Sequence, residues 1–346
     1  MDAKVDGACT MHGEYIAEAR DQFNQVLFQG GPFMTPTPQL LESKNVFARQ
    51  EGMLNYAEDS KGALLFPELS TVRGELERNM LAPERRSEYR SSAKTKIHDG
   101  ITWLLSTPGA SGNYYHWTLD LMPKLLYLLE EEISPCSQII LNAFSNRFQI
   151  DMFRKVLAEA IDRIIVARDA KSGYYKEVKI PFIAQARGKW PRGIDLLRNH
   201  YLPTDIHQES SKMIYVSRSD ATRRRVVNEK DILNILKRNN IEIVTLESVD
   251  VTMQAIMFNS ASLVIAPHGA ALTNIIYCKP GTTVIELFSH HIKPYYYHLA
   301  HQMKLKYMPL TCPYGERPLE KHAIQSSDLY VELDSLEQAI ERARYQ

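Results

Sequence analysis

The sequence lacks a long apolar run, and this absence bounds where the protein can work. None of its apolar runs reaches the roughly 18 residues that a helix needs to cross a bilayer. Its start, MDAKVDGACTMHGEYIAEAR, contains no apolar segment typical of a signal peptide, so the sequence predicts no secretory leader. We therefore expect a cytoplasmic protein, and we leave open a peripheral contact with the inner face of the membrane.

An excess of charge of either sign is also missing. Lysines plus arginines number 41, and aspartates plus glutamates also number 41. A protein that attracts nucleic acid through its overall field carries a basic excess, so we expect no nucleic-acid partner. A local basic patch is still compatible with this balance.

Cysteine is scarce and follows no pattern. The four cysteines, Cys9, Cys136, Cys278 and Cys312, include no pair with CxxC spacing. The spacing disfavours a disulfide framework and a zinc ribbon, and it fits a reducing compartment.

The length of 346 residues favours two domains, since a single core stops growing at roughly 250 to 300 residues. The polar stretch from Lys189 to Lys212, broken by two prolines and a glycine, is the predicted linker. We expect an N-terminal domain over residues 1–205, a C-terminal Rossmann-like domain over 206–320, and a final helix over 321–346 that packs back on the N-terminal domain. Short strands and loops are expected over the first hundred residues.

Strand-like runs alternate with helical patterns along most of the chain. In the second half the strand candidates are MIYVS, IEIVTL, ASLVIA and TTVIELF. Runs this apolar are typical of parallel strands covered by helices on both faces, so the sequence predicts an α/β fold. The first half repeats this alternation, with strand candidates ITWLL, QIILN, RIIVA and VKIPFIA and helix candidates HWTLDLMPKLLYLLEEE and NRFQIDMFRKVLAEA.

Capping residues predict where several helices of the second half begin. Asn228 and Ser248 are each placed to cap the helix that follows. A further helix is expected over ALTNIIYC. The helix after Ser248 should bury three side chains: Met253, Ile256 and Met257.

Three polar features follow predicted strands, where ligands of open parallel sheets bind. The loop SRSDATRRRVVNE, residues 217–229, carries four arginines, whose planar forks suit phosphate oxygens. The corner APHGAA, residues 266–271, is neither a GxGxxG nor a Walker loop, but its small residues and the next helix start could receive an anion. Glu286 lies late in an apolar strand, where a carboxylate needs a partner. The alternative for the arginine loop is a solvated basic loop without a ligand. The alternative for His268, in the corner, is a histidine that only makes hydrogen bonds within the protein.

Three blocks in this order, GNYYHWTLDLMPKL, SR...RRVVNE and APHGAALTNIIYCKPGTTVIELF, resemble glycosyltransferase family 61. The resemblance covers roughly Ile101 to Pro309. It implies a GT-B-like fold, in which two Rossmann-like domains face each other across a cleft, and an inverting transfer of sugar. The family includes plant xylosyl- and arabinosyltransferases, animal N-acetylglucosaminyltransferases and bacterial capsular-polysaccharide proteins. The plant and animal members carry a membrane anchor. The sequence predicts none here, and in this respect it resembles the bacterial members.

The resemblance also implies roles for residues of the second half. Arg218 and Arg225 are expected to bind the donor diphosphate, and Glu286 the ribose. Asn228 and Glu229 match an Asn-Glu pair of the family, which either touches the donor or anchors the helix. The expected lining of the donor site from the corner onward is His268, Gly269, Ala270, Ala271, Leu272 and Asn274.

An inverting displacement needs a base for the acceptor hydroxyl, and the GNYYHWTLD block supplies two candidates. His116 and Asp120 are four residues apart and so share one face of a helix start. We favour Asp120 slightly, and the alternative is that Asp120 orients His116 or caps the helix. The candidates on the acceptor side are Asn113, Tyr115 and Trp117, although for Trp117 a core position is favoured over stacking against the acceptor.

The chain contains no Asp-x-Asp, the pair that holds a cation in metal-dependent sugar transferases of the other major fold. We therefore expect charge neutralisation by arginines and a helix N-terminus, with no metal and no cofactor beyond the nucleotide-sugar donor. UDP is the expected nucleotide. His298 and His301 are three residues apart but lack a supporting carboxylate pattern for a metal.

The function predicted from these features is transfer of a hexose or pentose to a glycan or lipid-linked acceptor in capsular polysaccharide synthesis. One alternative is a GT-B-shaped epimerase of a sugar nucleotide. Another is a scaffold that keeps the fold and has lost the chemistry. The sequence leaves the sugar, the acceptor and the oligomeric state open.

Overall fold

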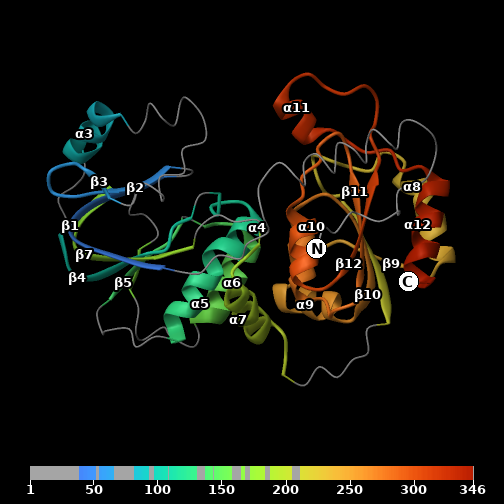
Figure 1. Cartoon of the computed structure of the whole chain (residues 1–346), viewed down its shortest axis with the longest axis horizontal. Coiled ribbons are helices and arrows are strands. Elements are labelled where there is room, and N and C mark those ends of the chain that lie inside the picture. The colour runs from blue at the N-terminus through green and yellow to red at the C-terminus, as the bar shows by residue number, and fades with distance from the viewer. Residues whose placement is uncertain are drawn as a thin grey trace, which may run out of the picture. The chain divides into compact units, whose positions relative to one another are not determined.

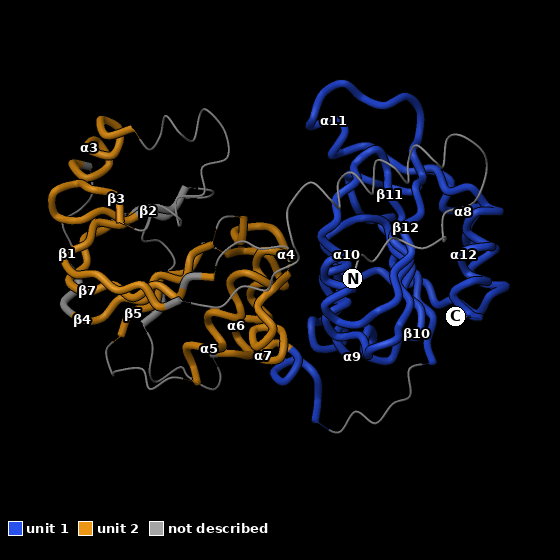
Figure 2. Tube along the Cα trace, in the orientation of Figure 1, with its two compact units in different colours: residues 1–34, 198–346 blue, residues 35–197 orange. Residues whose placement is uncertain are grey.

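The computed structural model describes residues 39–51, 54–65, 82–92, 97–107, 109–130, 137–142, 144–157, 165–167, 172–183, 188–204 and 211–345. Cys9, Cys136 and the turn-rich stretch GGPFMTPTP lie outside the described residues. The described residues fall into two compact units (Figure 2). We call residues 35–197 the N-terminal unit and residues 198–346 the C-terminal unit. The predicted roles of the domains stay predictions.

The C-terminal unit is built on a five-stranded sheet with the order β12-β11-β10-β8-β9. All of its neighbouring strands pair in parallel. The strands are β8 (Lys212–Val216), β9 (Glu242–Val244), β10 (Ala261–Pro267), β11 (Thr283–Phe288) and β12 (Lys306–Thr311). The four strands predicted from this half are present. The fifth, β12, contains Pro309, which an edge strand tolerates because one of its sides needs no ladder hydrogen bond.

Helices cover both faces of this sheet, as α/β packing requires. Figure 1 shows α8 and α12 on one face and α9 and α10 on the other. The helices are α8 (Glu229–Arg238), α9 (Val251–Asn259), α10 (Tyr295–Gln302), α11 (Lys321–Ser326), α12 (Leu333–Tyr345) and the 3₁₀-helix η3 (Ala270–Tyr277). The central strands β10 and β11 are almost wholly buried. This arrangement agrees with the predicted α/β class.

The strand order of the C-terminal unit reverses between β8 and β10. The chain runs from β8 outward to β9, then returns past β8 to β10, β11 and β12. In sequence order this is the 2-1-3-4-5 arrangement, whose ligands bind beyond the carboxyl ends of the two strands at the reversal. The arginine loop follows β8 and the APHGAA corner includes the end of β10, so the topology brings both to this point.

The N-terminal unit contains a seven-stranded mixed sheet with the order β3-β2-β1-β7-β4-β5-β6. The strands β7, β4, β5 and β6 are parallel, and β1 to β3 add an antiparallel edge. The strands are β1 (Gln39–Glu51), β2 (Leu54–Glu58), β3 (Leu64–Leu65), β4 (Ile97–Leu104), β5 (Gln138–Ile140), β6 (Ile165–Ala167) and β7 (Ser172–Phe182). The parallel part also reverses its order, between β4 and β7.

The first helical stretch after β4 is not uniform. It consists of α4 (Tyr114–His116), a π-helical turn η2 (Trp117–Leu121) and α5 (Met122–Glu130). Pro123 has no N–H to give to the preceding turn, and its ring would crowd the carbonyl four residues back. The π turn directly before it relieves this conflict, since the Met122 N–H reaches back to the Trp117 carbonyl. The other helices of this unit are α3 (Pro83–Ser92) and α6 (Arg147–Leu157), and α7 (Pro191–Tyr201) begins in this unit and ends in the C-terminal one.

The predicted linker between Lys189 and Lys212 is wrong for its first half, because α7 occupies it. Pro191 starts this helix, at a position where its missing N–H costs nothing. Ile194, Leu197 and Tyr201 recur at helical spacing and are all buried. Pro191 and Gly193 are typical of a linker, but Pro191 starts the helix, and a Cβ atom on Gly193 would lie 2.7 Å from the Trp190 ring.

The predicted start of α9 is also wrong. The capping residue is Asp250 instead of Ser248, because its carboxylate accepts from the Thr252 N–H at 2.8 Å. The helix therefore begins two residues later than a Ser248 cap requires, and Met253 points to solvent with 54% of its surface exposed. The stretch ALTNIIYC forms a 3₁₀-helix instead of an α-helix.

The final helix α12 packs within the C-terminal unit. Leu336, Ala339 and Ile340 are buried in the core that α8 and the parallel sheet share. The prediction placed this helix against the N-terminal domain, whereas its contacts are with α8 and β12.

Asn228 is the residue before α8, but its side chain does not cap that helix. Its amide nitrogen donates to the Val331 carbonyl at 2.8 Å, and its amide oxygen accepts from the Val331 N–H at 3.0 Å. The predicted cap is therefore wrong. The side chain ties α8 to the segment that leads into α12.

Replacing Asn228 tests this tie. Asn228→Ala leaves both backbone groups of Val331 without their buried partner, so we expect the free energy of unfolding to fall by about 2 kcal/mol. Urea unfolding followed by circular dichroism measures this change. Asn234→Ala, an exposed asparagine on the same helix, is the matched control and should change stability by less than about 0.5 kcal/mol. Equal effects of the two variants would contradict the assignment.

Candidate functional site

The loop after β8 is held in shape by Glu229. One carboxylate oxygen of Glu229 accepts from the Tyr215 hydroxyl and from the Ser217 hydroxyl, each at 2.8 Å. Ser217 in turn bonds to Ser219, so the start of the loop is tied to the first turn of α8. Of the two roles expected for Glu229, these contacts describe the anchoring one.

Arg218 reaches from this loop to the corner after β10. A Cβ atom on Gly269 would lie 2.4 Å from Nη1 of Arg218, so a larger residue there would displace the guanidinium. Nη2 of Arg218 donates to the Arg223 carbonyl at 3.1 Å. The buried Nε has no hydrogen-bond partner among the described residues. Glycine at the corner thus lets a cation with a spare donor lie against the end of β10.

Arg224 and Arg225 are neighbours in the chain, but their side chains have different surroundings. Arg225 donates from its backbone N–H and from Nη2 to the Asp328 carboxylate, at 2.9 and 3.2 Å, and its side chain is 57% exposed. Arg224 adopts the left-handed conformation, with φ of 55°, and its buried Nε has no described partner. Burial and the nearby Arg218 charge lower the pKa of Arg224. Arg224, which the sequence did not single out, therefore joins Arg218 near the corner, whereas the predicted Arg225 pairs elsewhere.

His268 and Glu286 form a buried pair at the ends of β10 and β11. Nδ1 of His268 lies 2.5 Å from one carboxylate oxygen of Glu286, and the Tyr307 hydroxyl donates to the other. Glu286 has no exposed surface. The predicted ribose contact of Glu286 stays a prediction, and both of its oxygens are already engaged in this structure.

Cations surround this pair. Burial, followed by the charges of Arg224, Arg218 and Lys293, lowers the pKa of His268 to about 3. Burial raises the pKa of Glu286 well above its usual range, although Tyr307 and Arg224 oppose that shift. The region therefore combines a neutral buried pair with three positive charges, which is a favourable setting for an anion.

The first turn of η3 follows this corner. Ala270 and Ala271 are partly exposed, whereas Leu272 and Asn274 have no exposed surface. The Asn274 amide donates to the Gln254 side chain at 2.8 Å, inside the core. The side chains of Leu272 and Asn274 are structural here, so their predicted contact with a donor could come only from backbone groups.

A second polar cluster lies at the strand reversal of the N-terminal unit. One carboxylate oxygen of Asp120 lies 2.7 Å from Nδ1 of His116, and the other accepts from Nζ of Lys189 at 2.6 Å. His116 comes from α4 and Lys189 from the segment after β7. Burial alone would raise the pKa of the Asp120 carboxyl, but Lys189 and His116 together hold it well below its usual range. The expected sharing of one helix face by His116 and Asp120 is confirmed.

Lys124 adds a further charge beneath this cluster. Its Nζ donates to the Thr107 hydroxyl at 3.0 Å, and burial lowers the pKa of Lys124 to about 8. Asn142, after β5, braces the same loop through two hydrogen bonds to the backbone of Thr107. Gly109 lies in the same loop. A Cβ atom there would lie 2.6 Å from the His116 ring, so a larger residue would displace the imidazole.

The three acceptor-side candidates have different surroundings. Asn113 caps α4 by accepting from the Tyr115 N–H at 2.9 Å. The Tyr115 ring lies under Nζ of Lys189, 4.7 Å from its centre. Trp117 is completely buried and packs against Phe144, so the favoured core position of Trp117 is confirmed.

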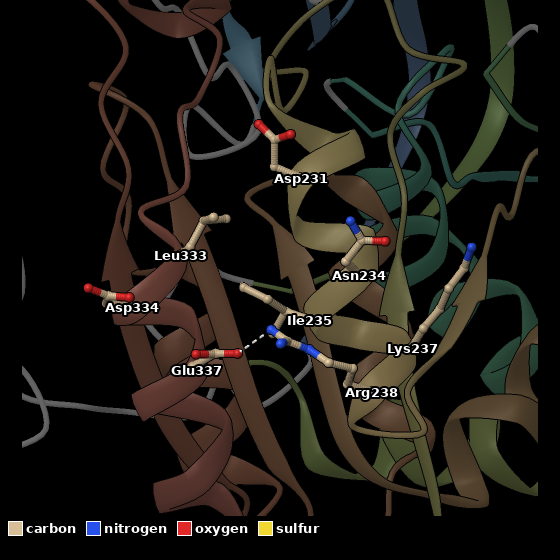
Figure 3. A pocket seen from close by; sticks show the side chains of 8 residues that line it. All are labelled: Asp231, Asn234, Ile235, Lys237, Arg238, Leu333, Asp334 and Glu337. Carbon is tan, nitrogen blue, oxygen red and sulfur yellow. Dashed lines mark hydrogen bonds and ion pairs between the residues drawn. The ribbon is translucent and has the colours of Figure 1, made fainter.

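A separate groove of about 710 Å³ lies between α8 and α12 in the C-terminal unit (Figure 3). Two of its charged residues, Arg238 and Glu337, form an ion pair at 2.7 Å. Both partners are exposed, so solvent weakens their attraction. The groove contains neither of the two clusters described above. Its lining residues are Asp231, Asn234, Ile235, Lys237, Arg238, Leu333, Asp334 and Glu337.

A family model described as Glycosyltransferase 61 matches residues 114–285. The match supports glycosyltransferase family 61. It starts at α4 with the His116–Asp120 cluster, contains Arg218, Arg224 and His268, and ends one residue before Glu286. A search of curated proteins finds no match. The family implies a glycosyltransferase, and the match includes His116, Asp120, Arg218, Arg224 and His268 but not Glu286 or Tyr307.

Two further properties concern the described part of the chain alone. No helix there is long and apolar enough to cross a membrane. No group of three or more histidine, cysteine or acidic side chains there is arranged to hold a metal ion. The predictions of a metal-independent reaction and of a cytoplasmic location stay predictions.

Replacing each of the two neighbouring arginines, Arg224 and Arg225, by glutamine in separate variants tests the site. We expect Arg224→Gln to weaken binding of UDP at least about tenfold, because it removes a charge-assisted donor. Arg225→Gln should change the dissociation constant by less than about threefold and instead loosen the contact with Asp328. Isothermal titration calorimetry measures both, and the melting temperatures confirm folding. Weak binding by Arg225→Gln together with normal binding by Arg224→Gln would contradict the site.

Proposed function

We propose that the protein is an inverting glycosyltransferase that moves a sugar from a nucleoside-diphosphate sugar to a glycan or lipid-linked acceptor. One observation carries the proposal. Arg218 and Arg224 bring guanidinium groups with spare buried donors to the strand reversal of a parallel sheet, beside His268. The family match supports the same reaction class.

The donor diphosphate is the negatively charged part of the substrate, and the C-terminal unit offers matching charge. Arg218, Arg224 and Lys293 all act electrostatically on His268. Guanidinium groups bind phosphate oxygens through paired, charge-assisted hydrogen bonds. Such fixed charges can neutralise the departing diphosphate, which is the task that a cation performs in metal-dependent transferases.

We infer that His116, and not Asp120, is the base that accepts the acceptor's proton. Both carboxylate oxygens of Asp120 are engaged, and the pKa of Asp120 is lowered, so it is a weak proton acceptor. Nδ1 of His116 is held by Asp120, and Nε2 has no hydrogen-bond partner within the described residues. The Asp120 carboxylate holds the ring hydrogen on Nδ1 and so leaves Nε2 as the nitrogen that can accept a proton. The sequence favours Asp120 slightly as the base, whereas these contacts favour His116.

The bonds in the proposed transfer balance as follows. An acceptor hydroxyl loses its proton to Nε2 of His116, and its oxygen forms a bond to the anomeric carbon. The bond from that carbon to the diphosphate oxygen breaks, and its electron pair leaves with the diphosphate. Arg218 and Arg224 stabilise the resulting charge. A single displacement from the opposite face inverts the configuration at the anomeric carbon.

Glu286 has a supporting role in this proposal. Its two oxygens bind His268 and Tyr307, and it has no exposed surface. We therefore assign to it the orientation of His268 and leave the ribose contact to other groups. The GT-B arrangement, a UDP-linked donor and a place in capsular polysaccharide synthesis at or near the cytoplasmic face of the membrane are further parts of the proposal, and they rest on the resemblance to the family.

Substitution of the two candidate bases tests the proposal. We expect His116→Gln to lower kcat by about 10²- to 10⁴-fold, while the dissociation constant for the donor stays unchanged. Asp120→Asn should lower kcat less, because the imidazole remains. Release of nucleoside diphosphate and the mass of the glycosylated acceptor, measured over panels of donors and acceptors, provide the readout. His322→Gln, an exposed histidine on α11, is the control.

The outcomes separate the alternatives. Full loss in Asp120→Asn with normal transfer by His116→Gln would return the role of base to Asp120. A donor isomer formed without any acceptor would point to an epimerase. No binding of any nucleotide sugar by the wild-type protein would favour a scaffold.

A further inference from the structure

Residues 326–329, between α11 and α12, run beside the end of the arginine loop in the C-terminal unit. Val226 and Leu329 form a parallel β-bridge. The Leu329 N–H donates to the Arg225 carbonyl at 2.8 Å, and the Val227 N–H donates to the Leu329 carbonyl at 2.9 Å. A segment far along the chain therefore pairs with the loop just before α8 begins.

Two further contacts of this segment lie on either side of Arg224. The Arg224 N–H donates to the Ser326 carbonyl at 3.4 Å. The next N–H, that of Arg225, donates to Oδ1 of Asp328 at 2.9 Å, and Nη2 of Arg225 donates to Oδ2 at 3.2 Å. The peptide groups before and after Arg224 are therefore bound to the same segment.

The 326–329 segment is itself fixed from its other side. Leu329 has no exposed surface, and it also forms an antiparallel β-bridge with Pro313, two residues after β12. The hydroxyl groups of Ser327 and Ser289 are hydrogen-bonded at 3.1 Å, directly after β11. The segment is thus tied to the ends of two strands, and it forms a fixed support for the loop.

Arg224 needs such a support because of its backbone conformation. Its φ of 55° lies in the left-handed region, which is unfavourable for residues other than glycine. A residue keeps such a conformation only where its surroundings determine it. At Arg224 the contacts that do so are those with Ser326 and Asp328.

The left-handed residue gives the two neighbouring arginines different directions. The Arg225 side chain is 57% exposed and pairs with Asp328. Nε of Arg224 is buried and has no hydrogen-bond partner in the part of the chain that the structure describes. A right-handed Arg224 would direct its guanidinium elsewhere. The phosphate donor that the proposed function assigns to Arg224 thus depends on one backbone conformation.

We propose that Asp328 is a positioning residue of the donor site: by accepting from the Arg225 N–H, it holds Arg224 in the left-handed conformation that presents its guanidinium to the donor diphosphate. This inference rests on the proposed function and deepens it. Asp328 itself does not touch the donor, and it lies outside the residues 114–285 that the family model matches.

Calorimetric titration of the full-length protein with UDP tests this role. In Asp328→Ala the Arg225 N–H loses its acceptor, so Arg224 should leave the left-handed conformation in most molecules. The apparent dissociation constant rises as the fraction of binding-competent molecules falls, and we expect it to rise about tenfold. The melting temperature of the variant shows whether it is folded.

Three variants control for other effects of the substitution. Asp328→Asn keeps an oxygen that accepts from the Arg225 N–H and should bind UDP within about threefold of the wild-type protein. Asp334→Ala removes an exposed aspartate from the first turn of α12 and should leave the dissociation constant unchanged. If Asp328→Ala does not fold, Asp328→Ser replaces it, because a side chain one atom shorter does not reach the same N–H.

A double-variant cycle identifies the group through which Asp328 acts. Arg224→Gln removes the guanidinium that Asp328 is proposed to position. In that background Asp328→Ala should therefore raise the dissociation constant by less than about twofold. A role in the stability of the fold alone would lower the melting temperature and would change UDP binding equally in both backgrounds.

Three results would overturn the inference and leave the proposed function intact. The first is a folded Asp328→Ala variant that binds UDP as tightly as the wild-type protein. The second is a loss of affinity that is as large in the Arg224→Gln background as in the wild type. The third is an equal loss in Asp328→Asn and Asp328→Ala, which would assign the effect to charge. A wild-type protein that binds no UDP would instead contradict the proposed function and the inference together.

Discussion

The buried carboxyl group of Glu286 is the constraint on which the proposed donor site depends. Glu286 lies in β11, in register with Ala266 of β10 and Pro309 of β12, where water cannot reach it. A carboxyl group without partners in such a place costs several kcal/mol, on the order of a whole domain's stability. The neighbouring strands satisfy it with His268 and Tyr307. The same contacts fix the histidine ring just after the carboxyl end of β10, where the charges of Arg218 and Arg224 act on it.

Each unit gathers its charged cluster where the order of its parallel strands reverses. In the C-terminal unit these are the ends of β8 and β10, with Arg218 and His268, and in the N-terminal unit the ends of β4 and β7, with His116 and Lys189. At a reversal the flanking connections run to opposite faces of the sheet, so the strand ends between them stay accessible. The chemistry of the two clusters differs: one is rich in positive charge, and the other pairs an ionised carboxylate with an imidazole.

The sequence predicted the parts of this structure that depend on local pattern. Apolar runs located the parallel strands, helical spacing placed the His116–Asp120 face, and strand ends pointed to the arginine loop. It could not say whether Arg224 or Arg225 enters the site, because a left-handed residue in an irregular loop decides this. The partners of Asn228 and Glu286 come from residues 103 and 21 positions away along the chain, and no local pattern reveals such pairings.

The central claim is that a nucleoside diphosphate binds at the strand reversal of the C-terminal unit. Hydrogen–deuterium exchange with and without UDP tests it directly, because bound ligand slows local opening of the backbone. The account predicts slower exchange in residues 217–229 and 267–274, with unchanged exchange in α12. Protection confined to the groove between α8 and α12, with none in those two segments, would contradict it.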